Sequence, residues 1–147
     1  MISWIVKKFD DLTVRELYAI LRLRSEVFVV EQNCVFQDMD NKDQSSWHLM
    51  GWQGDLLIAY TRLIPPGVAY TSASIGRVIT APVTRGTGIG KLLMERSIEE
   101  AKRLFGRVPI KIGAQLYLRE FYHSFGFKQS SDVYDEDGID HIEMIRQ

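Results

Sequence analysis

The segment from Arg85 to Lys91 reads RGTGIGK and places three glycines at alternate positions between two cations. An apolar, strand-like stretch ends shortly before it at Pro82, and a helical period of apolar residues begins inside it at Ile89. A glycine loop between a strand and a helix collects free backbone N–H groups, and the helix N-terminus adds roughly half a positive charge. The segment therefore predicts a strand–loop–helix unit whose loop either binds an anion or forms a plain turn.

Two nucleotide-binding motifs can be tested against this loop by position. A Walker A loop requires a glycine where this chain has Arg85, and a Ser or Thr where Leu92 follows Lys91. A dinucleotide fingerprint requires glycines spaced by two and then by three, whereas the three glycines here are spaced by two and two. ATP binding through a Walker A loop and NAD binding are therefore both disfavoured.

The rest of the chain alternates between strand-like and helix-like patterns. We expect strands over residues 2–7, 47–53, 56–64, 74–80, 109–114, 131–134 and 139–145. We expect helices after the capping box Thr13–Glu16, from Ile89 to Phe105 with Gly106 as the C-terminal cap, and around residues 118–125. This order predicts a mixed α/β fold in a single domain spanning residues 1–147.

Two features of the N-terminal half leave alternatives open. Arg24 interrupts the apolar stripe of the first helix. Either its aliphatic stem covers apolar surface while its charged head stays in water, or its guanidinium contacts an anion or the substrate. Residues 33–46 are polar and acidic without a sustained period, which predicts a loop beside or over a site. Within this loop, we expect Cys34 to be a small, buried or half-buried filler.

Charge and cysteine content exclude several classes of protein. The 18 Lys and Arg and 19 Asp and Glu give a net charge of −1, so the chain has no general attraction to nucleic acid or to an anionic membrane. A single cysteine excludes an intrachain disulfide. Lys7 and Lys8 stand where a signal peptide needs its apolar core, and no apolar run approaches a membrane-spanning length. We expect a cytoplasmic protein without nucleic-acid or membrane partners.

The run from Val78 to Gly90, VITAPVTRGTGIG, resembles the acetyl-CoA signature of the GNAT superfamily of N-acetyltransferases, in which Arg/Gln-x-x-Gly-x-Gly/Ala follows the fourth strand. The resemblance implies that the anion is the CoA pyrophosphate. It also implies a central, mostly antiparallel twisted sheet flanked by helices. The implied CoA contacts are the main chain of Val78 and Ile79 beside the pantetheine arm, and Arg85, Gly86, Thr87, Gly88, Ile89, Gly90 and Lys91 around the phosphates.

A second segment, Gln115–Phe127, is similar to the second CoA segment of that family, Asn-x-x-Ala-x-x-Phe-Tyr-x-x-x-Gly-Phe. Gln115 replaces the usual Asn and Leu118 the usual Ala, and the resemblance implies that both lie near CoA together with Tyr122. Residues 28–34, 37–40, 48–52 and 133–142 resemble the ElaA-type branch of the family. The resemblance thus spans nearly the whole chain.

Acetyl transfer to an amine requires a free lone pair, a stabilised oxyanion and a proton for the departing thiolate. The resemblance makes Tyr122 the general acid, and a backbone N–H near Val78 or Ile79 the group that holds the carbonyl oxygen. In a regular strand Arg77 points to the face opposite Val78. The candidates for the base or for an acceptor contact are Glu31, His48, Glu136 and His141.

Acidic residues in two loops favour a cationic acceptor, such as a polyamine, an aminosugar or a lysine side chain, unless they only solvate a turn. They are Asp38, Asp40, Asp135, Glu136, Asp137 and Asp140. We therefore expect an N-acetyltransferase that uses acetyl-CoA as co-substrate, without a metal, on a small-molecule or peptidyl primary amine. An acyl-CoA-binding sensor without turnover and a plain structural domain are the alternatives, and the residues leave monomer and homodimer open.

Overall fold

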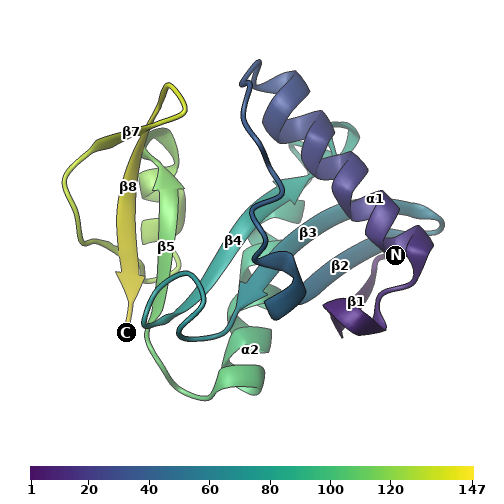
Figure 1. Ribbon diagram of the computed structural model, residues 1–147, viewed down its shortest axis with the longest axis horizontal. Coiled ribbons are helices and arrows are strands. Elements are labelled where there is room, and N and C mark those ends of the chain that lie inside the picture. The colour runs from purple at the N-terminus through teal and green to yellow at the C-terminus, as the bar shows by residue number, and fades with distance from the viewer.

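The computed structural model describes residues 1–147, which fold around one twisted sheet of eight strands (Figure 1). The strands follow the order β1-β2-β3-β4-β5-β8-β6, and β7 pairs with β8. They are β1 (Ser3–Lys8), β2 (Trp47–Gln53), β3 (Leu56–Ile64), β4 (Ala73–Thr80), β5 (Ile110–Gln115), β6 (Lys128–Gln129), β7 (Tyr134–Glu136) and β8 (Ile139–Arg146). Only β4 and β5 pair in parallel, so the mostly antiparallel sheet expected from the resemblance is confirmed.

The first helix, α1 (Val14–Arg24), begins at the predicted capping box. The Glu16 amide donates to Thr13 Oγ1 over 3.0 Å, and the Thr13 amide donates to Glu16 Oε1 over 2.8 Å. The chain continues beyond Arg24 as π-helical turns from Ser25 to Glu31 (η2). Ile20, Leu23 and Val27 form the buried side of this arm and pack against β2, β3 and β4.

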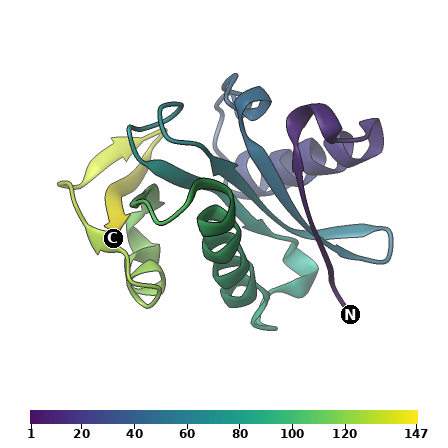
Figure 2. The same ribbon diagram turned by 90° about the horizontal axis from the view of Figure 1, so that it is seen from below.

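The second helix, α2 (Ile89–Phe105), has the predicted bounds and ends at Gly106. Its buried residues Leu93, Met94 and Ile98 join the second core, on the face of the sheet opposite α1. Figure 2 shows α1 and α2 on the two sides of the sheet. The predicted third helix is shorter than expected: a 3-10 turn (η5, Leu116–Leu118) precedes α3 (Arg119–His123). Three more 3-10 turns lie at Phe9–Asp11, Asp43–Ser45 and Pro82–Thr84.

The tail differs from the sequence-based expectation. The strand predicted over residues 131–134 is shifted, because only Tyr134–Glu136 pairs with β8. The two-residue strand β6 pairs with the other end of β8 and was not predicted. None of the helices combines the length and apolarity that crossing a bilayer requires.

The sheet opens between β4 and β5. These strands share only two residue pairs, Ala73 with Ile110 and Ser74 with Lys111, and diverge beyond them (Figure 1). Since the remaining residues of β4 and β5 have no partner strand between them, the sheet splits into a larger β1–β4 half and a smaller half of β5 to β8. The split leaves a wedge whose walls belong to both halves.

A bulge changes the course of β4 beside this wedge. Tyr60 pairs with Ile79 and Arg62 with Gly76, so Arg77 and Val78 together face the single residue Thr61. Arg77 adopts φ 51°, in the left-handed region that residues with a side chain rarely occupy. The strand is thus not regular at this point, which the expectation for Arg77 and Val78 assumed. Arg77 contacts Asp38 of the loop after η2, whereas Val78 packs against the core cluster that contains α2.

Candidate active site

A cavity of about 510 Å³ occupies the wedge. One wall is β4, which lines it continuously from Ile75 to Thr80, and the other consists of β5, Leu118, Tyr122 and the β7–β8 turn. A third side is formed by the end of η2 and the residues after it, from Val27 to Phe36. Both residues of the bulge, Arg77 and Val78, belong to this lining. The predicted CoA contacts Val78, Ile79, Gln115 and Leu118 all line this cavity.

Tyr122 lines the same cavity from α3. Its side chain packs edge-on against Phe121 and Phe127, and the residue is only 7% exposed. Its hydroxyl makes no hydrogen bond within the protein. It is also not fully buried, because the only fully buried side-chain nitrogen or oxygen without a hydrogen bond is Arg62 Nε. Burial, with a smaller effect from Tyr117, raises the pKa of Tyr122 to about 12. At neutral pH this hydroxyl is a protonated donor with no protein partner.

The RGTGIGK loop connects β4 to α2 beside one end of the cavity. Gly86 and Gly88 have φ of 82° and 83°, which only glycine adopts without strain, and an added Cβ at either position would point into open space. No side chain caps α2, and no backbone amide from Gly86 to Lys91 donates to a backbone acceptor. Unpaired amides at a helix N-terminus are able to bind an anion.

Arg85 joins this loop to η2. Its Nη1 and Nη2 donate to the two carboxylate oxygens of Glu31 over 2.7 and 2.6 Å. Both side chains are partly exposed, at 46% and 39%, and both residues line the cavity. The hydrogen bonds and charge of Arg85 hold the pKa of Glu31 below its usual range. Glu31 is thus an ion-paired carboxylate with a weakened capacity to act as a base.

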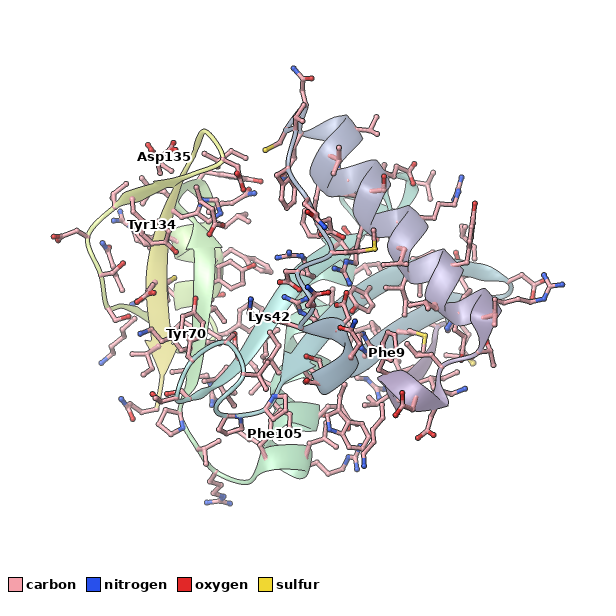
Figure 3. All side chains as sticks on the ribbon, in the orientation of Figure 1. Phe9, Lys42, Tyr70, Phe105, Tyr134 and Asp135 are labelled. Carbon is pink, nitrogen blue, oxygen red and sulfur yellow. The ribbon has the colours of Figure 1, made fainter.

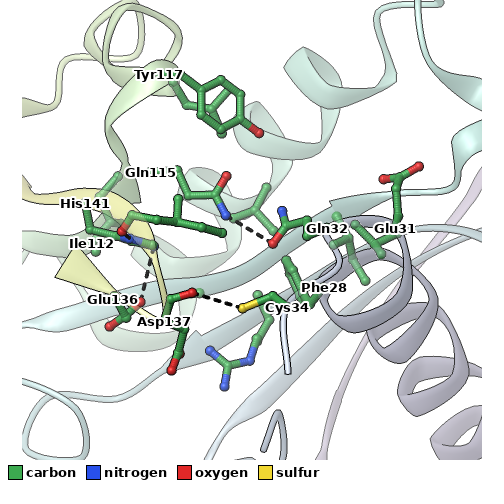
Figure 4. A pocket seen from close by; sticks show the side chains of 18 of the residues that line it. Phe28, Glu31, Gln32, Cys34, Ile112, Gln115, Tyr117, Glu136, Asp137 and His141 are labelled. Atoms are coloured by element: carbon green, nitrogen blue, oxygen red, sulfur yellow. Dashed lines mark hydrogen bonds and ion pairs between the residues drawn. The ribbon is translucent and has the colours of Figure 1, made fainter. Parts of the chain in front are cut away.

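The segment Glu31–Cys34 crosses the cavity as a strap and contacts three different elements. Besides the Glu31–Arg85 pair, Gln32 Oε1 accepts from Gln115 Nε2 of β5 over 3.4 Å. Cys34 Sγ donates to the Asp137 carbonyl in the β7–β8 turn over 3.3 Å, and Cys34 is buried as expected. Figure 4 shows the Gln32–Gln115 bond between the Tyr117 side of the cavity and the side formed by Glu136, Asp137 and Cys34.

His141 and Glu136 form a pair on the β7–β8 side of the cavity. His141 Nε2 lies 3.2 Å from Glu136 Oε2, and His141 Nδ1 lies 2.8 Å from the Ile139 carbonyl oxygen, to which it donates (Figure 4). The Glu136 carboxylate can also only accept, so the ring donates to both partners only as an imidazolium. In the neutral ring with its proton on Nδ1, the Nε2 lone pair faces the carboxylate. The ring is 7% exposed and stacks on Tyr134 at 6.0 Å between centroids. Both candidate residues therefore line the same cavity as Tyr122.

His48, the remaining base candidate, does not line the cavity. It is 1% exposed within the core between Tyr60 and Asp43. Its Nε2 lies 2.9 Å from the Asp43 carbonyl oxygen, which can only accept, and its Nδ1 lies 2.6 Å from the Tyr60 hydroxyl, from which it accepts. Burial lowers the pKa of His48, so both bonds belong to a neutral ring. The structure makes His48 a satisfied core histidine.

Arg24 is fully buried at 0% exposure, so the expectation of a solvated head is wrong. Its Nε donates to Asp38 Oδ2 and its Nη1 to Asp43 Oδ1, each over 2.8 Å. Arg62 binds Asp40 through two bonds of 2.7 and 2.9 Å and also reaches Asp43 over 3.0 Å. The charges of Asp38 and Asp40 are thus paired within the protein and do not form the free acidic surface that the sequence suggested.

The predicted loop over residues 33–46 lies beside the site, as expected. Its acidic residues are held there by ion pairs with arginines, among them Arg77 of the cavity wall. Figure 3 shows Lys42 of the loop over the β3 and β4 side of the molecule, apart from Tyr134 and Asp135 on β7. Sequence reasoning did not assign Gln32, Phe36 or Arg77 to the site and gave Tyr117 only as a weaker substitute for Tyr122, although all four line the cavity. Gln32 and Tyr117 lie inside the segments that carried the resemblance, which is the signal that could have identified them.

The comparisons with known proteins agree with this geometry. The acetyltransferase (GNAT) domain family matches residues 16–147. Protein ElaA of Escherichia coli is 42% identical over 149 residues, which covers 100% of this chain and 97% of the relative. The crystal structure of an acyl-CoA N-acyltransferase from Pseudomonas aeruginosa matches with a TM-score of 0.96 and 43% identity over 100% of both chains, and that of Escherichia coli ElaA with 0.94 and 42%, also over 100% of both. The chain therefore belongs to the GNAT family of acetyltransferases, in its ElaA-like branch.

Proposed function

We propose that this protein transfers an acetyl group from acetyl-CoA to a primary amine of a small molecule or peptide, with Tyr122 as the general acid. Family membership supports acyl-CoA-dependent N-acyl transfer as the class of activity. The observation that carries the finer proposal is the Tyr122 hydroxyl, a protonated donor without a protein partner on the wall of the wedge. The free amides of the RGTGIGK loop support an anionic donor that enters from the adjacent end.

In the proposed reaction the amine nitrogen attacks the thioester carbonyl carbon, the C–S bond breaks, the nitrogen loses a proton and the sulfur gains one. In this proposal a backbone N–H of the bulged part of β4 donates to the carbonyl oxygen as negative charge develops there. The thiol, with an ordinary pKa of about 8.5, is a stronger acid than Tyr122, so the Tyr122 hydroxyl assists chiefly by donating a hydrogen bond to the sulfur as the C–S bond breaks. Solvent then restores the tyrosine proton.

The amine must lose its own proton first, because an alkyl amine with a pKa of about 10.4 is neutral to only about one part in 2,500 at pH 7. Among the four candidates, His141 is best suited to this role. Its Nε2 carries the lone pair, and the Glu136 carboxylate 3.2 Å away stabilises the imidazolium that forms. Glu31 is held by Arg85, and His48 lies outside the cavity.

We also propose a cationic acceptor, but fewer acidic residues support it than the sequence suggested, because Asp38 and Asp40 are ion-paired within the protein. Glu136, the last residue of β7, and Asp137 of the turn after it both line the cavity and are exposed. An ammonium ion that approaches from this side meets negative charge before it loses its proton. We therefore expect amines with a second positive charge to have lower KM values than neutral amines of the same size.

Thiol release from acetyl-CoA in the presence of a panel of amines tests the proposal. We expect Tyr122→Phe to lower kcat by about 10²- to 10⁴-fold, the usual contribution of a general acid, and to change the Kd for CoA less than twofold. Tyr18→Phe is the matched control, because Tyr18 is 72% exposed on α1 and outside the cavity. Binding of acetyl-CoA without thiol release for any amine would instead support the sensor, and an unchanged kcat in Tyr122→Phe would reject the general acid.

A further inference from the structure

Arg77 combines an unfavourable backbone with an extensively bonded side chain. Its φ of 51° is unfavourable in a residue with a Cβ, and such conformations persist only where the surroundings hold them. It is also the first residue of the β4 bulge, next to Val78 and Ile79. The contacts of the Arg77 side chain therefore bear on where the backbone of the cavity wall lies.

The acidic loop supplies those contacts. Arg77 Nε donates to Asp38 Oδ1 and Arg77 Nη2 to the Asp38 carbonyl oxygen, each over 2.8 Å. Arg77 Nη2 also reaches Asp40 Oδ2 over 3.4 Å, and the guanidinium lies 6.0 Å from the ring centroid of Phe36. One residue, Asp38, thus accepts both short hydrogen bonds that the Arg77 side chain donates.

Asp38 is itself fixed from the other side. Its second carboxylate oxygen accepts from Arg24 Nε over 2.8 Å, and Arg24 is completely buried at the end of α1. Arg24 is held in turn by Asp43, which is shared with Arg62 of β3. The chain of contacts Arg24–Asp38–Arg77 therefore connects the end of α1 to the bulge, with Asp38 as its central member.

We propose that Asp38 is a positioning residue for acyl transfer: it clamps Arg77 and so fixes the bulge whose backbone holds the acyl carbonyl. The proposal rests on the proposed function for its catalytic consequence but not for the clamp itself. Asp40 faces the same network mainly through Arg62 and touches Arg77 only at 3.4 Å. Substitution of Asp38 should therefore affect both the bulge and the ion-pair network, whereas substitution of Asp40 should affect mainly the network.

The test compares Asp38→Asn with Asp40→Asn in the full-length protein. We expect Asp38→Asn to lower kcat at least tenfold more than Asp40→Asn, at temperatures where both are folded. Acetyl-CoA and CoA differ only in the acyl group, so loss of the carbonyl contact should weaken acetyl-CoA binding at least threefold more than CoA binding in Asp38→Asn alone. Equal losses of both affinities, with kcat falling in step with stability in both variants, would overturn the proposal.

A readout without ligand separates this inference from the proposed function. In ligand-free protein, the amide resonances of Val78 and Ile79 should shift in Asp38→Asn and stay near their wild-type positions in Asp40→Asn, whether or not the wild type acetylates any amine. Unmoved resonances in Asp38→Asn would reject the clamp. Arg77→Lys keeps the charge but loses the forked guanidinium, and should reproduce both the shift and the acyl-selective loss if Asp38→Asn does not fold.

Discussion

The Glu31 carboxylate and the Arg85 guanidinium form a two-bonded ion pair, at 2.7 and 2.6 Å, between the strap over the cavity and the loop that offers its free amides to an anion. A phosphate of acetyl-CoA would approach the Arg85 guanidinium while two of its N–H groups are already bonded to Glu31. Because exposed ion pairs contribute little net free energy, about 0 to 1 kcal/mol, a phosphate can displace the carboxylate at small cost.

Removing the competing carboxylate should therefore tighten donor binding. We expect Glu31→Gln to lower the Kd for CoA about three- to tenfold at low ionic strength, because Arg85 is then free for a phosphate, and we expect added salt to reduce this gain. Isothermal titration measures the change. Glu26→Gln is the matched control: it removes the same charge from the same exposed side of η2 but makes no hydrogen bond to Arg85. Equal tightening in both variants would attribute the effect to net charge alone.

Arg24 is expected to contribute more to stability than any exposed arginine. Arg24→Met removes one partner from each of the carboxylates of Asp38 and Asp43, which then keep only Arg77 and Arg62, and breaking a buried ion pair from one side costs roughly 3 to 5 kcal/mol. Urea unfolding measures the loss. Arg22→Met, on the exposed side of the same helix, should change the free energy of unfolding by less than about 0.5 kcal/mol. A loss below 1 kcal/mol in Arg24→Met would show that the network is replaceable.

The elements that the sequence predicted best are those with strong local turn chemistry at their ends. The bounds of β2, β3 and α2 agree with the structure, because Gly54 turns the hairpin with φ 61° and Gly106 ends the helix with φ 82°. The strand β6 and the position of β7 were not predicted, since both depend on pairing with β8 rather than on a local pattern. The π-helical turns of η2 also carry no sequence period of their own.

Continuous motifs in the sequence predicted the part of the site assigned to CoA. The rest depends on contacts between residues far apart in the sequence and could not be predicted. The loop from Arg85 to Lys91 and the segment with Tyr122 are continuous motifs, so their residues could be assigned by position. Arg24 meets Asp43 across 19 residues and Arg77 meets Asp38 across 39, and no periodicity reports such pairs. The bulge at Arg77 and Val78 could not be predicted for the same reason, because it depends on the pairing of β4 with β3.

Protonation of His48 should make stability fall on mild acidification. Burial lowers the pKa of His48 in the folded protein, so between the usual value of about 6.5 and that lower pKa the unfolded chain takes up a proton that the folded chain does not. Stability is complete above about pH 6.5 and declines below it, by at most about 1.4 kcal/mol per pH unit for this group. Urea unfolding between pH 5 and 8 measures this slope.

The His48 contribution can be isolated by substitution. His48→Gln removes the titrating group, so the slope between pH 5 and 6.5 should become shallower even though the variant is less stable at pH 8. Wild-type and His48→Gln slopes that coincide would assign the acid sensitivity elsewhere. The lowered pKa values of Asp40 and Asp43 add a separate loss only below about pH 4, where unfolded carboxyl groups gain protons first.

The raised pKa of Tyr122 sets an expectation for the alkaline side of the reaction. An unperturbed tyrosine loses its proton near pH 10, whereas burial raises the pKa of Tyr122 to about 12, so the donor stays protonated well above pH 10. With an acceptor amine of low pKa, which is fully neutral by pH 8.5, kcat should stay constant from about pH 8.5 to 10.5. Thiol release, corrected for spontaneous thioester hydrolysis, measures the profile, and circular dichroism verifies that the protein stays folded. A descending limb with an apparent pKa near 10 in a folded protein would reject Tyr122 as the proton donor, and Tyr117, 74% exposed beside the cavity, would be the first residue to substitute.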